Sequence, residues 1–114
     1  MTTICLIRHG RTEANARKLY CGSTDVPLSA DGIAQLRELR EAGGYPMCDA
    51  QMVYTSDMLR ARQTLEILYG ISEHAALTDF REMDFGAFEM RSYEEMKREP
   101  AYLHWIADQT GEVA

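Results

Sequence analysis

The sequence predicts an α/β fold, because short apolar segments alternate with longer segments whose apolar residues recur at helical spacing. The apolar segments that we expect to form strands are residues 2–8, 51–55 and 75–78. An amphipathic segment separates each strand from the next. The predicted order is therefore β-α-β-α-β within one domain spanning residues 1–114.

The first predicted helix follows Ser29, a residue type that caps helix N-termini with its side-chain oxygen. Ile33, Leu36 and Leu39 then recur at helical spacing, and Gly43-Gly44 ends the pattern. We therefore expect an amphipathic helix between Ser29 and Gly43.

The second predicted helix follows Ser56, which is expected to cap it, and ends at Gly70. Apolar residues share one face of it, at Met58, Ala61, Leu65 and Leu68. The third strand, residues 75–78, is short enough to depend on neighbouring strands for its stability.

A charged, helical segment over residues 87–108 is expected to lie like a lid over the crevice at the strand ends. Ser92 and Glu95 have the spacing of a capping box, and Pro100 separates a second helical piece. Tyr102, Trp105 and Ile106 are expected to share one face of that piece.

Composition limits the classes of partner. The net charge of −6 over 114 residues argues against general nucleic-acid binding, so a small-molecule partner is favoured. No apolar run approaches the roughly 20 residues of a membrane span, and the N-terminus does not look like a signal peptide. Cys5, Cys21 and Cys48 lack metal-ligand spacing, so we expect reduced thiols, no metal, no cofactor and a cytoplasmic location.

A basic pair and a glycine follow the first predicted strand, at Arg8, His9 and Gly10. Side chains at the carboxyl ends of parallel strands point into the ligand crevice of an α/β protein. Arg8 offers a planar fork suited to two phosphate oxygens, and His9 can act as nucleophile or base near pH 7. Glycine allows the backbone to approach an anion closely. Phosphate chemistry is therefore the first hypothesis.

Three motifs occur in order along the chain: Arg8-His9-Gly10-x-Thr12-x-x-Asn15, Thr55-Ser56-x-x-x-Arg60-Ala61-x-x-Thr64 and Arg81-Glu82-Met83-Asp84-Phe85-Gly86. Together they resemble the histidine phosphatase superfamily, also called phosphoglycerate-mutase-like. The resemblance runs from Thr2 to about Trp105. It implies a three-layer sandwich with a mostly parallel sheet, whose C-terminal strands are missing from this sequence.

The resemblance also implies site residues. His9 would attack phosphorus and become a phosphohistidine, which water then hydrolyses. Arg8 and Arg60 would hold the phosphoryl oxygens, and Glu82, which follows the third strand, would protonate the leaving group. Phosphate or substrate contacts are expected from Asn15, Thr12, Cys21 and Gly22, with packing as an equal alternative for the last two.

Two features depart from the family pattern. Relatives carry a second catalytic histidine near the end of a later strand, and neither His74 nor His104 is expected to replace it. The family's Trp-Glu-Gly reads Phe88-Glu89-Met90 here, and Glu89 is interpreted as a solvated carboxylate. The chain also shows no closing strand over residues 110–114. We therefore expect the N-terminal part of a longer protein, whose open sheet edge a C-terminal fragment or a homo-oligomer would cover.

Alternative functions stay open. Cys5, Arg11 and Thr12 have the spacing of cysteine-dependent tyrosine phosphatases, but Leu6 and Ile7 continue a strand where such a loop needs small residues. Residues 20–29 and 81–105 look most like phosphatases of the α-ribazole phosphatase branch. Phosphoglycerate-mutase-type transfer is the runner-up, and a phosphate-binding fragment with impaired catalysis is the non-enzymatic hypothesis.

Overall fold

The protein is described by a computed structural model that covers residues 1–47, 49 and 51–108. Its elements are, in order, α1 (Glu13–Ala16), α2 (Ala30–Glu41), β1 (Tyr54–Thr55), α3 (Leu59–Tyr69), β2 (Ala75–Ala76), η1 (Thr78–Phe80), η2 (Gly86–Phe88), α4 (Tyr93–Met96) and α5 (Pro100–Ala107). Cys48 and the expectation of no closing strand over residues 110–114 fall outside the described residues.

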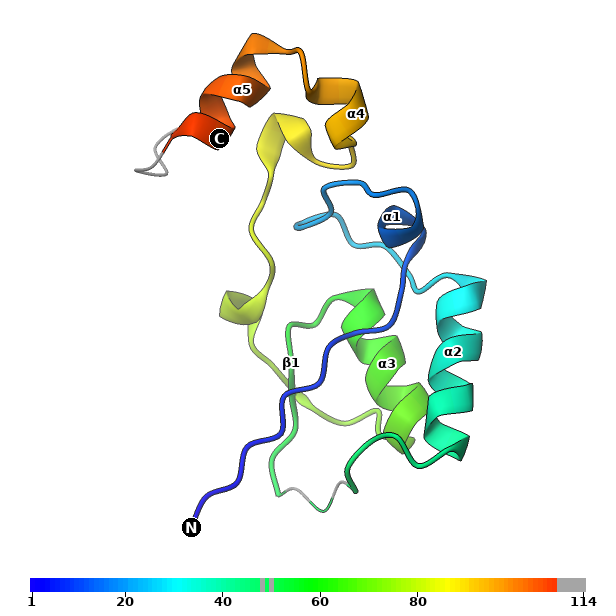
Figure 1. The fold of residues 1–114 in the computed structure, drawn as a ribbon. Helices are drawn as coiled ribbons and strands as arrows, with labels where there is room; N and C mark the ends of the chain where they lie inside the picture. The colour runs from blue at the N-terminus through cyan, green and yellow to red at the C-terminus, as the bar shows by residue number, and fades with distance from the viewer. Residues whose placement is uncertain (48, 50, 109–114) are drawn as a thin grey trace.

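Strands β1 and β2 pair in parallel around α3, as a β-α-β unit requires. Tyr54 lies opposite Ala75 and Thr55 opposite Ala76, and the Leu77 amide donates to the Thr55 carbonyl at 2.8 Å. Helix α2 lies side by side with α3, the helix of this unit (Figure 1). The predicted alternation of strands and helices is confirmed over residues 30–76, although both strands are shorter than expected.

The predicted ends of α2 and α3 are largely confirmed. The Ser29 hydroxyl caps α2 by accepting the Gly32 amide at 3.0 Å. Helix α3 ends at Gly70, whose φ of +66° is the left-handed conformation that glycine adopts without strain.

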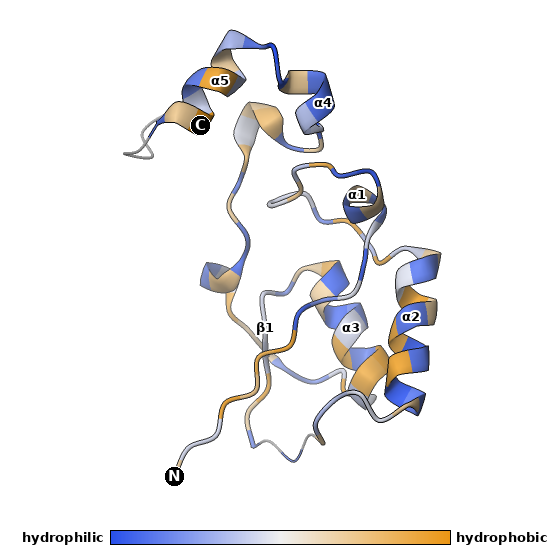
Figure 2. Ribbon diagram, in the orientation of Figure 1, coloured by the Kyte–Doolittle hydropathy of each residue, from blue (hydrophilic) through white to orange (hydrophobic). Residues whose placement is uncertain are grey.

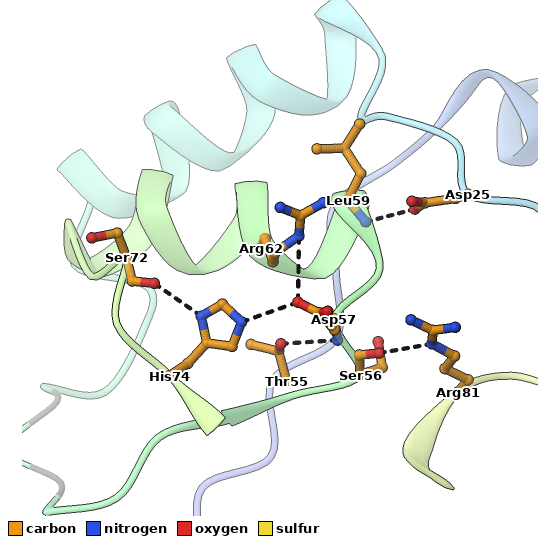
Figure 3. Close-up of polar contacts among 9 residues, drawn as sticks. All are labelled: Asp25, Thr55, Ser56, Asp57, Leu59, Arg62, Ser72, His74 and Arg81. Atoms are coloured by element: carbon orange, nitrogen blue, oxygen red, sulfur yellow. Dashed lines mark hydrogen bonds and ion pairs between the residues drawn. The ribbon is translucent and has the colours of Figure 1, made fainter. Parts of the chain in front are cut away.

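The start of α3 differs from the prediction that Ser56 caps it. Asp57 has a φ of +64°, so the chain turns after Ser56 and the N-cap is Met58, which makes no side-chain capping bond. A distant residue supplies the cap instead, because Asp25 Oδ1 accepts the Leu59 amide at 2.7 Å (Figure 3).

A polar network fixes this turn against the segment before β2 (Figure 3). The Asp57 carboxylate lies 3.4 Å from His74 Nε2 and 3.7 Å from Arg62 Nε. His74 Nδ1 lies 3.0 Å from the Ser72 carbonyl, so both ring nitrogens have structural partners.

The strand predicted over residues 2–8 is wrong for the described structure. This segment is extended but has no paired strand on either side (Figure 1). Ile4 and Leu6 are 77% and 92% exposed, and much of the segment is coloured as hydrophobic in the ribbon (Figure 2). A β-strand requires hydrogen-bonded neighbours, and an isolated extended segment cannot bury its side chains.

Two hydrophobic clusters organise the rest of the chain. Leu28, Leu36 and Leu68 are buried between α2 and α3. The second cluster joins η2, α4 and α5 through Met96 and five buried or partly buried aromatic rings, those of Phe88, Tyr102, Tyr20, Phe85 and Trp105. Helices α4 and α5 lie at one end of the molecule, away from α2 and α3, with α1 and the loop after it between them (Figure 1).

The prediction for α4 and α5 is confirmed in part. Ser92 caps α4 by accepting the Glu95 amide, and Pro100 begins α5. Ile106 is 53% exposed, however, so it does not share the buried face of Tyr102 and Trp105. That these helices act as a lid stays a prediction.

Candidate active site

A cleft of about 500 Å³ opens beside the end of the N-terminal segment. Its polar lining includes Arg8, His9, Arg11, Asn15 and Lys18. Within the described part of the chain, no carboxylate lines it, so its charge is positive although the whole chain is acidic. Such a cleft suits an anionic ligand.

His9 has the tautomer that a nucleophile needs. Its Nδ1 lies 2.6 Å from the Gly10 carbonyl, which can only accept, so Nδ1 carries the proton and Nε2 keeps its lone pair. Burial lowers the pKa of His9, and the charges of Arg60 and Arg8 act in the same direction against the hydrogen bond to Gly10. The ring is therefore neutral near pH 7.

Thr64 connects His9 to Arg60, a function that the sequence analysis did not assign. The Thr64 hydroxyl accepts the buried Gly10 amide at 3.0 Å and donates to the Arg60 carbonyl at 2.8 Å. The position of Thr64, one helical turn after Arg60 in the second motif, was the only signal in the sequence.

Gly10 also has a packing role. A Cβ at Gly10 would lie 2.7 Å from Leu36 Cδ1, so the missing side chain allows close packing against α2. Gly10 also lines the cleft, and an approach of its backbone to an anion stays a prediction.

Arg60 is buried, with only 5% of its surface exposed, in the first turn of α3. Its two terminal nitrogens donate to the carbonyls of Gly22 and Thr24, each at 2.8 Å. The guanidinium is therefore held in one orientation while its charge reaches His9.

The interpretation of Glu89 as a solvated carboxylate is wrong. Its Oε1 accepts the amides of Gly22 at 2.7 Å and Thr24 at 2.8 Å, and its Oε2 accepts the Phe85 amide at 3.0 Å. Burial would raise the pKa of Glu89, but these hydrogen bonds outweigh it and hold the pKa below its ordinary value. The sequence carries no local signal for this role, because two of the three amides, those of Gly22 and Thr24, come from a distant loop.

Glu82 is exposed, and its Oε1 accepts the Met83 amide at 3.4 Å. Its charge nevertheless acts on His9, as do those of Arg8 and Arg60. The charges of Arg8, Arg60 and Glu82 thus all act on the His9 ring. Of these four residues, Arg8 and His9 line the cleft, and Arg60 and Glu82 do not.

The remaining candidates have structural contacts of their own. Thr12 is 1% exposed and caps α1, while Asn15 Oδ1 accepts the Thr12 amide at 3.0 Å. The side-chain NH₂ of Asn15, which lines the cleft, is the group left for a ligand. Direct contact of Thr12 with phosphate stays a prediction.

Cys21 and Cys5 do not form a thiolate site. The Cys21 thiol donates to the Thr24 carbonyl at 3.7 Å, and burial raises its pKa, so it stays protonated. Cys5 lies exposed in the extended N-terminal segment and does not line the cleft. The geometry therefore disfavours the cysteine-dependent alternative.

Two kinds of feature are absent from the described part of the chain. Among residues 1–47, 49 and 51–108, no group of three His, Cys, Asp or Glu side chains is placed to hold a metal ion. No helix in the same ranges is both long and apolar enough to cross a membrane.

Comparisons with known proteins agree with the motifs. Residues 4–114 match the family model of the histidine phosphatase superfamily, branch 1. The chain is 38% identical over 108 residues to the uncharacterized phosphatase PhoE of Bacillus subtilis, covering 91% of this chain and 54% of that protein. It is 35% identical to the adenosylcobalamin/alpha-ribazole phosphatase of Salmonella typhimurium, covering 90% and 52%.

A crystal structure of phosphoglycerate mutase from Thermus thermophilus superimposes with a TM-score of 0.66 at 36% identity, covering 88% of this chain and 53% of that one. The fold is therefore phosphoglycerate-mutase-like, and the chain spans about half the length of the relatives it matches. The three motifs, the fold and the family match agree that the chain belongs to the histidine phosphatase superfamily.

Proposed function

We propose that this site hydrolyses phosphomonoesters through a phosphohistidine on His9. The observation that carries the proposal is the hydrogen bond from His9 Nδ1 to the Gly10 carbonyl, which leaves Nε2 free to attack phosphorus. The charges of Arg8 and Arg60 act at the same ring and would stabilise the transferred phosphoryl group.

The reaction would take two steps. Nε2 of His9 bonds to phosphorus while the ester P–O bond breaks, and Glu82 donates a proton to the leaving oxygen. Water then attacks phosphorus, the P–N bond breaks, and the Glu82 carboxylate accepts the proton from water. Asn15 would donate its side-chain NH₂ to the phosphoryl group in both steps, beside a backbone contact from Cys21. The Gly22 amide and carbonyl are already bound by Glu89 and Arg60, which favours the packing alternative for Gly22.

A small phosphorylated metabolite is the substrate class that this proposal favours. The cleft is positive and the surface is acidic overall, which disfavours nucleic acid. One relative is named an adenosylcobalamin/alpha-ribazole phosphatase, so an α-ribazole phosphate-like ester is the first substrate to test. We place the protein in the cytoplasm, in keeping with its free Cys5 and Cys21 thiols, and the reaction needs no cofactor.

The test separates histidine from cysteine chemistry. In a complete domain with a phosphomonoester as substrate, His9→Ala should lose nearly all turnover and all acid-labile, base-stable phosphate label on the protein. Cys5→Ser should keep most of the turnover and most of the phosphate label. The reverse pattern would refute the proposal.

Phosphoglycerate-mutase-type transfer is the second candidate, because Arg11 and Lys18 line the same cleft as His9. These extra cations could hold a second anionic group of the substrate. An Arg11→Ala, Lys18→Ala double variant should then bind phosphocarboxylates much more weakly than the wild type does, and simple alkyl phosphates only slightly more weakly. Equal effects on both would favour the phosphatase interpretation.

The chain exposes 8430 Å², compared with about 6,300 Å² for a typical folded monomer of its 13.0 kDa mass. Part of the excess comes from the unpaired segment that contains Ile4 and Leu6. We propose that the strands of the second half of a histidine phosphatase domain cover this segment, since the matched relatives are about twice as long. The chain without that half would bind phosphate with impaired turnover.

A further inference from the structure

We propose that Glu89 is a positioning residue, which sets the place of the acid Glu82 relative to His9 by clamping the loop over residues 22–24. This inference deepens the proposed function of the same site and rests on it. It assigns a catalytic consequence to a carboxylate that touches neither the cleft nor the reacting atoms.

The loop over residues 22–24 is bound by charged groups of both signs. Arg60 donates to the carbonyls of Gly22 and Thr24, and Glu89 accepts the amides of the same two residues. One loop is thus bound through its acceptors by a buried cation and through its donors by an anion. Bonds to charged groups are the stronger class of hydrogen bond.

The loop is also fixed to α3 beyond these residues. Asp25 Oδ1 accepts the first amide of α3, at Leu59, and the Leu28 amide donates to Gln63 Oε1 at 2.7 Å. Because Thr64 of the same helix holds the Gly10 amide, the loop and His9 share one rigid support.

The segment that carries Glu82 lies directly against this loop. A Cβ at Gly22 would lie 1.7 Å from the Met83 carbonyl oxygen, so only glycine allows the two backbones to approach this closely. Glu89 closes the same segment by accepting the Phe85 amide. The carboxylate therefore joins the loop to the turn that follows Glu82.

A second set of contacts, which does not involve the Glu89 side chain, holds α4 and α5 in place. The effect of Glu89 on the loop can therefore be distinguished from an effect on the stability of the fold. Backbone hydrogen bonds connect the Tyr20 amide to the Arg91 carbonyl at 2.9 Å and the Met90 amide to the Tyr20 carbonyl at 2.6 Å. The aromatic cluster around Phe88 and Trp105 packs beside them. A change at Glu89 should therefore leave α4 and α5 in place while releasing residues 22–24 and 82–85.

The chemistry of Glu89 requires a carboxylate. Three backbone donors, from Gly22, Thr24 and Phe85, converge on its two oxygens, and an amide side chain would set its own NH₂ against at least one of them. Glu89→Gln is therefore the informative variant. Glu94→Gln is the matched control, because Glu94 is exposed and pairs with the surface Lys97.

The experiment uses the 114-residue chain with two NMR measurements and a phosphate titration. In Glu89→Gln, the amides of Gly22 and Thr24 should exchange at least about tenfold faster, and inorganic phosphate should bind about tenfold more weakly. Glu94→Gln should change neither. The Tyr20 and Arg91 signals should stay native-like in both variants.

The pKa of the His9 ring, measured by NMR titration, would stay unchanged if Glu89 acted only on its own loop. Arg8, Arg60 and Glu82 supply the charges around this ring, and Glu82 is the one that raises the pKa of His9. If Glu82 is displaced in Glu89→Gln, the midpoint of the His9 titration should therefore fall further. Glu89→Asp keeps the charge and should give intermediate values, so it replaces the Gln variant if the latter does not fold.

Faster exchange with an unchanged His9 midpoint would overturn the inference, because Glu89 would then only hold its loop. If the Gly22 and Thr24 amides exchange at the wild-type rate in Glu89→Gln, Glu89 does not hold the loop and the inference is refuted. If the wild-type chain binds no phosphate, the proposed function fails, and the His9 midpoint alone then decides the role of Glu89.

Discussion

Thr64 offers the most direct test of how the site is held together. Its hydroxyl accepts the Gly10 amide, which is buried and lies next to His9. Thr64→Val keeps the shape of the side chain and removes the hydroxyl, so the Gly10 amide loses its partner. A buried donor without a partner costs about 1–3 kcal/mol of unfolding free energy.

For a chain of this length, that loss corresponds to a fall in Tm of roughly 4–12 °C. Thr64→Ser is the matched comparison, because it keeps the hydroxyl and loses only one methyl group, worth about 1 kcal/mol. Thr78→Val, at an exposed position, controls for the substitution itself.

Thermal and urea unfolding measure these differences, and phosphate titration adds a site readout. We expect Thr64→Val to be less stable than Thr64→Ser and to bind phosphate more weakly, because the backbone at His9 loses its anchor to α3. If Thr64→Val is as stable as Thr64→Ser, the hydrogen bond does not support the site and the reasoning is refuted.

Four further predictions concern charge and surface. Arg8→Ala should abolish the rise in Tm that phosphate or vanadate gives to the wild type, as measured by thermal unfolding. The pKa of His9 lies below 6.5, so its contribution to stability is complete above pH 6.5 and declines as the pH falls toward the folded-state pKa; urea midpoints of His9→Gln should lack this decline. Glu82→Gln, in a complete domain, should slow hydrolysis of an alkyl phosphate by roughly 10²–10⁴-fold and of an activated aryl phosphate less, and equal losses would make Glu82 an orienting residue. Leu6→Lys should leave the stability of this chain within about 0.5 kcal/mol, because Leu6 is exposed, yet prevent assembly with the second half of the domain in a pull-down; unimpaired assembly would exclude the segment as the interface.

Local patterns in the sequence were sufficient for the elements whose determinants are local. Ser29 caps α2 and Gly70 ends α3 because each effect acts within one helical turn. The same reasoning failed at Ser56, because the cap of α3 comes from Asp25, 34 positions away from the amide it accepts. The strand expected over residues 2–8 failed because pairing partners, not propensity, create a strand.

The candidate site divides in the same way. His9, Arg8, Arg60 and Glu82 were named from the resemblance of their motifs to the family, and in the structure the charges of the other three act on the His9 ring. The roles of Thr64 and Glu89 could not be named in this way, since both depend on which backbone groups lie nearby after folding. Side chains that bind backbone amides far away in the chain leave no pairwise signature in the sequence.

The buried contacts of Arg60 have a thermodynamic consequence for recognition. A free arginine side chain carries about 2 kcal/mol of rotamer entropy, which an exposed residue loses when it binds an anion. Arg60 has lost that freedom on folding, because the carbonyls of Gly22 and Thr24 already fix both terminal nitrogens. Arg60 would therefore act on a phosphate in the cleft through its charge, from a fixed position, at no further cost in rotamer entropy.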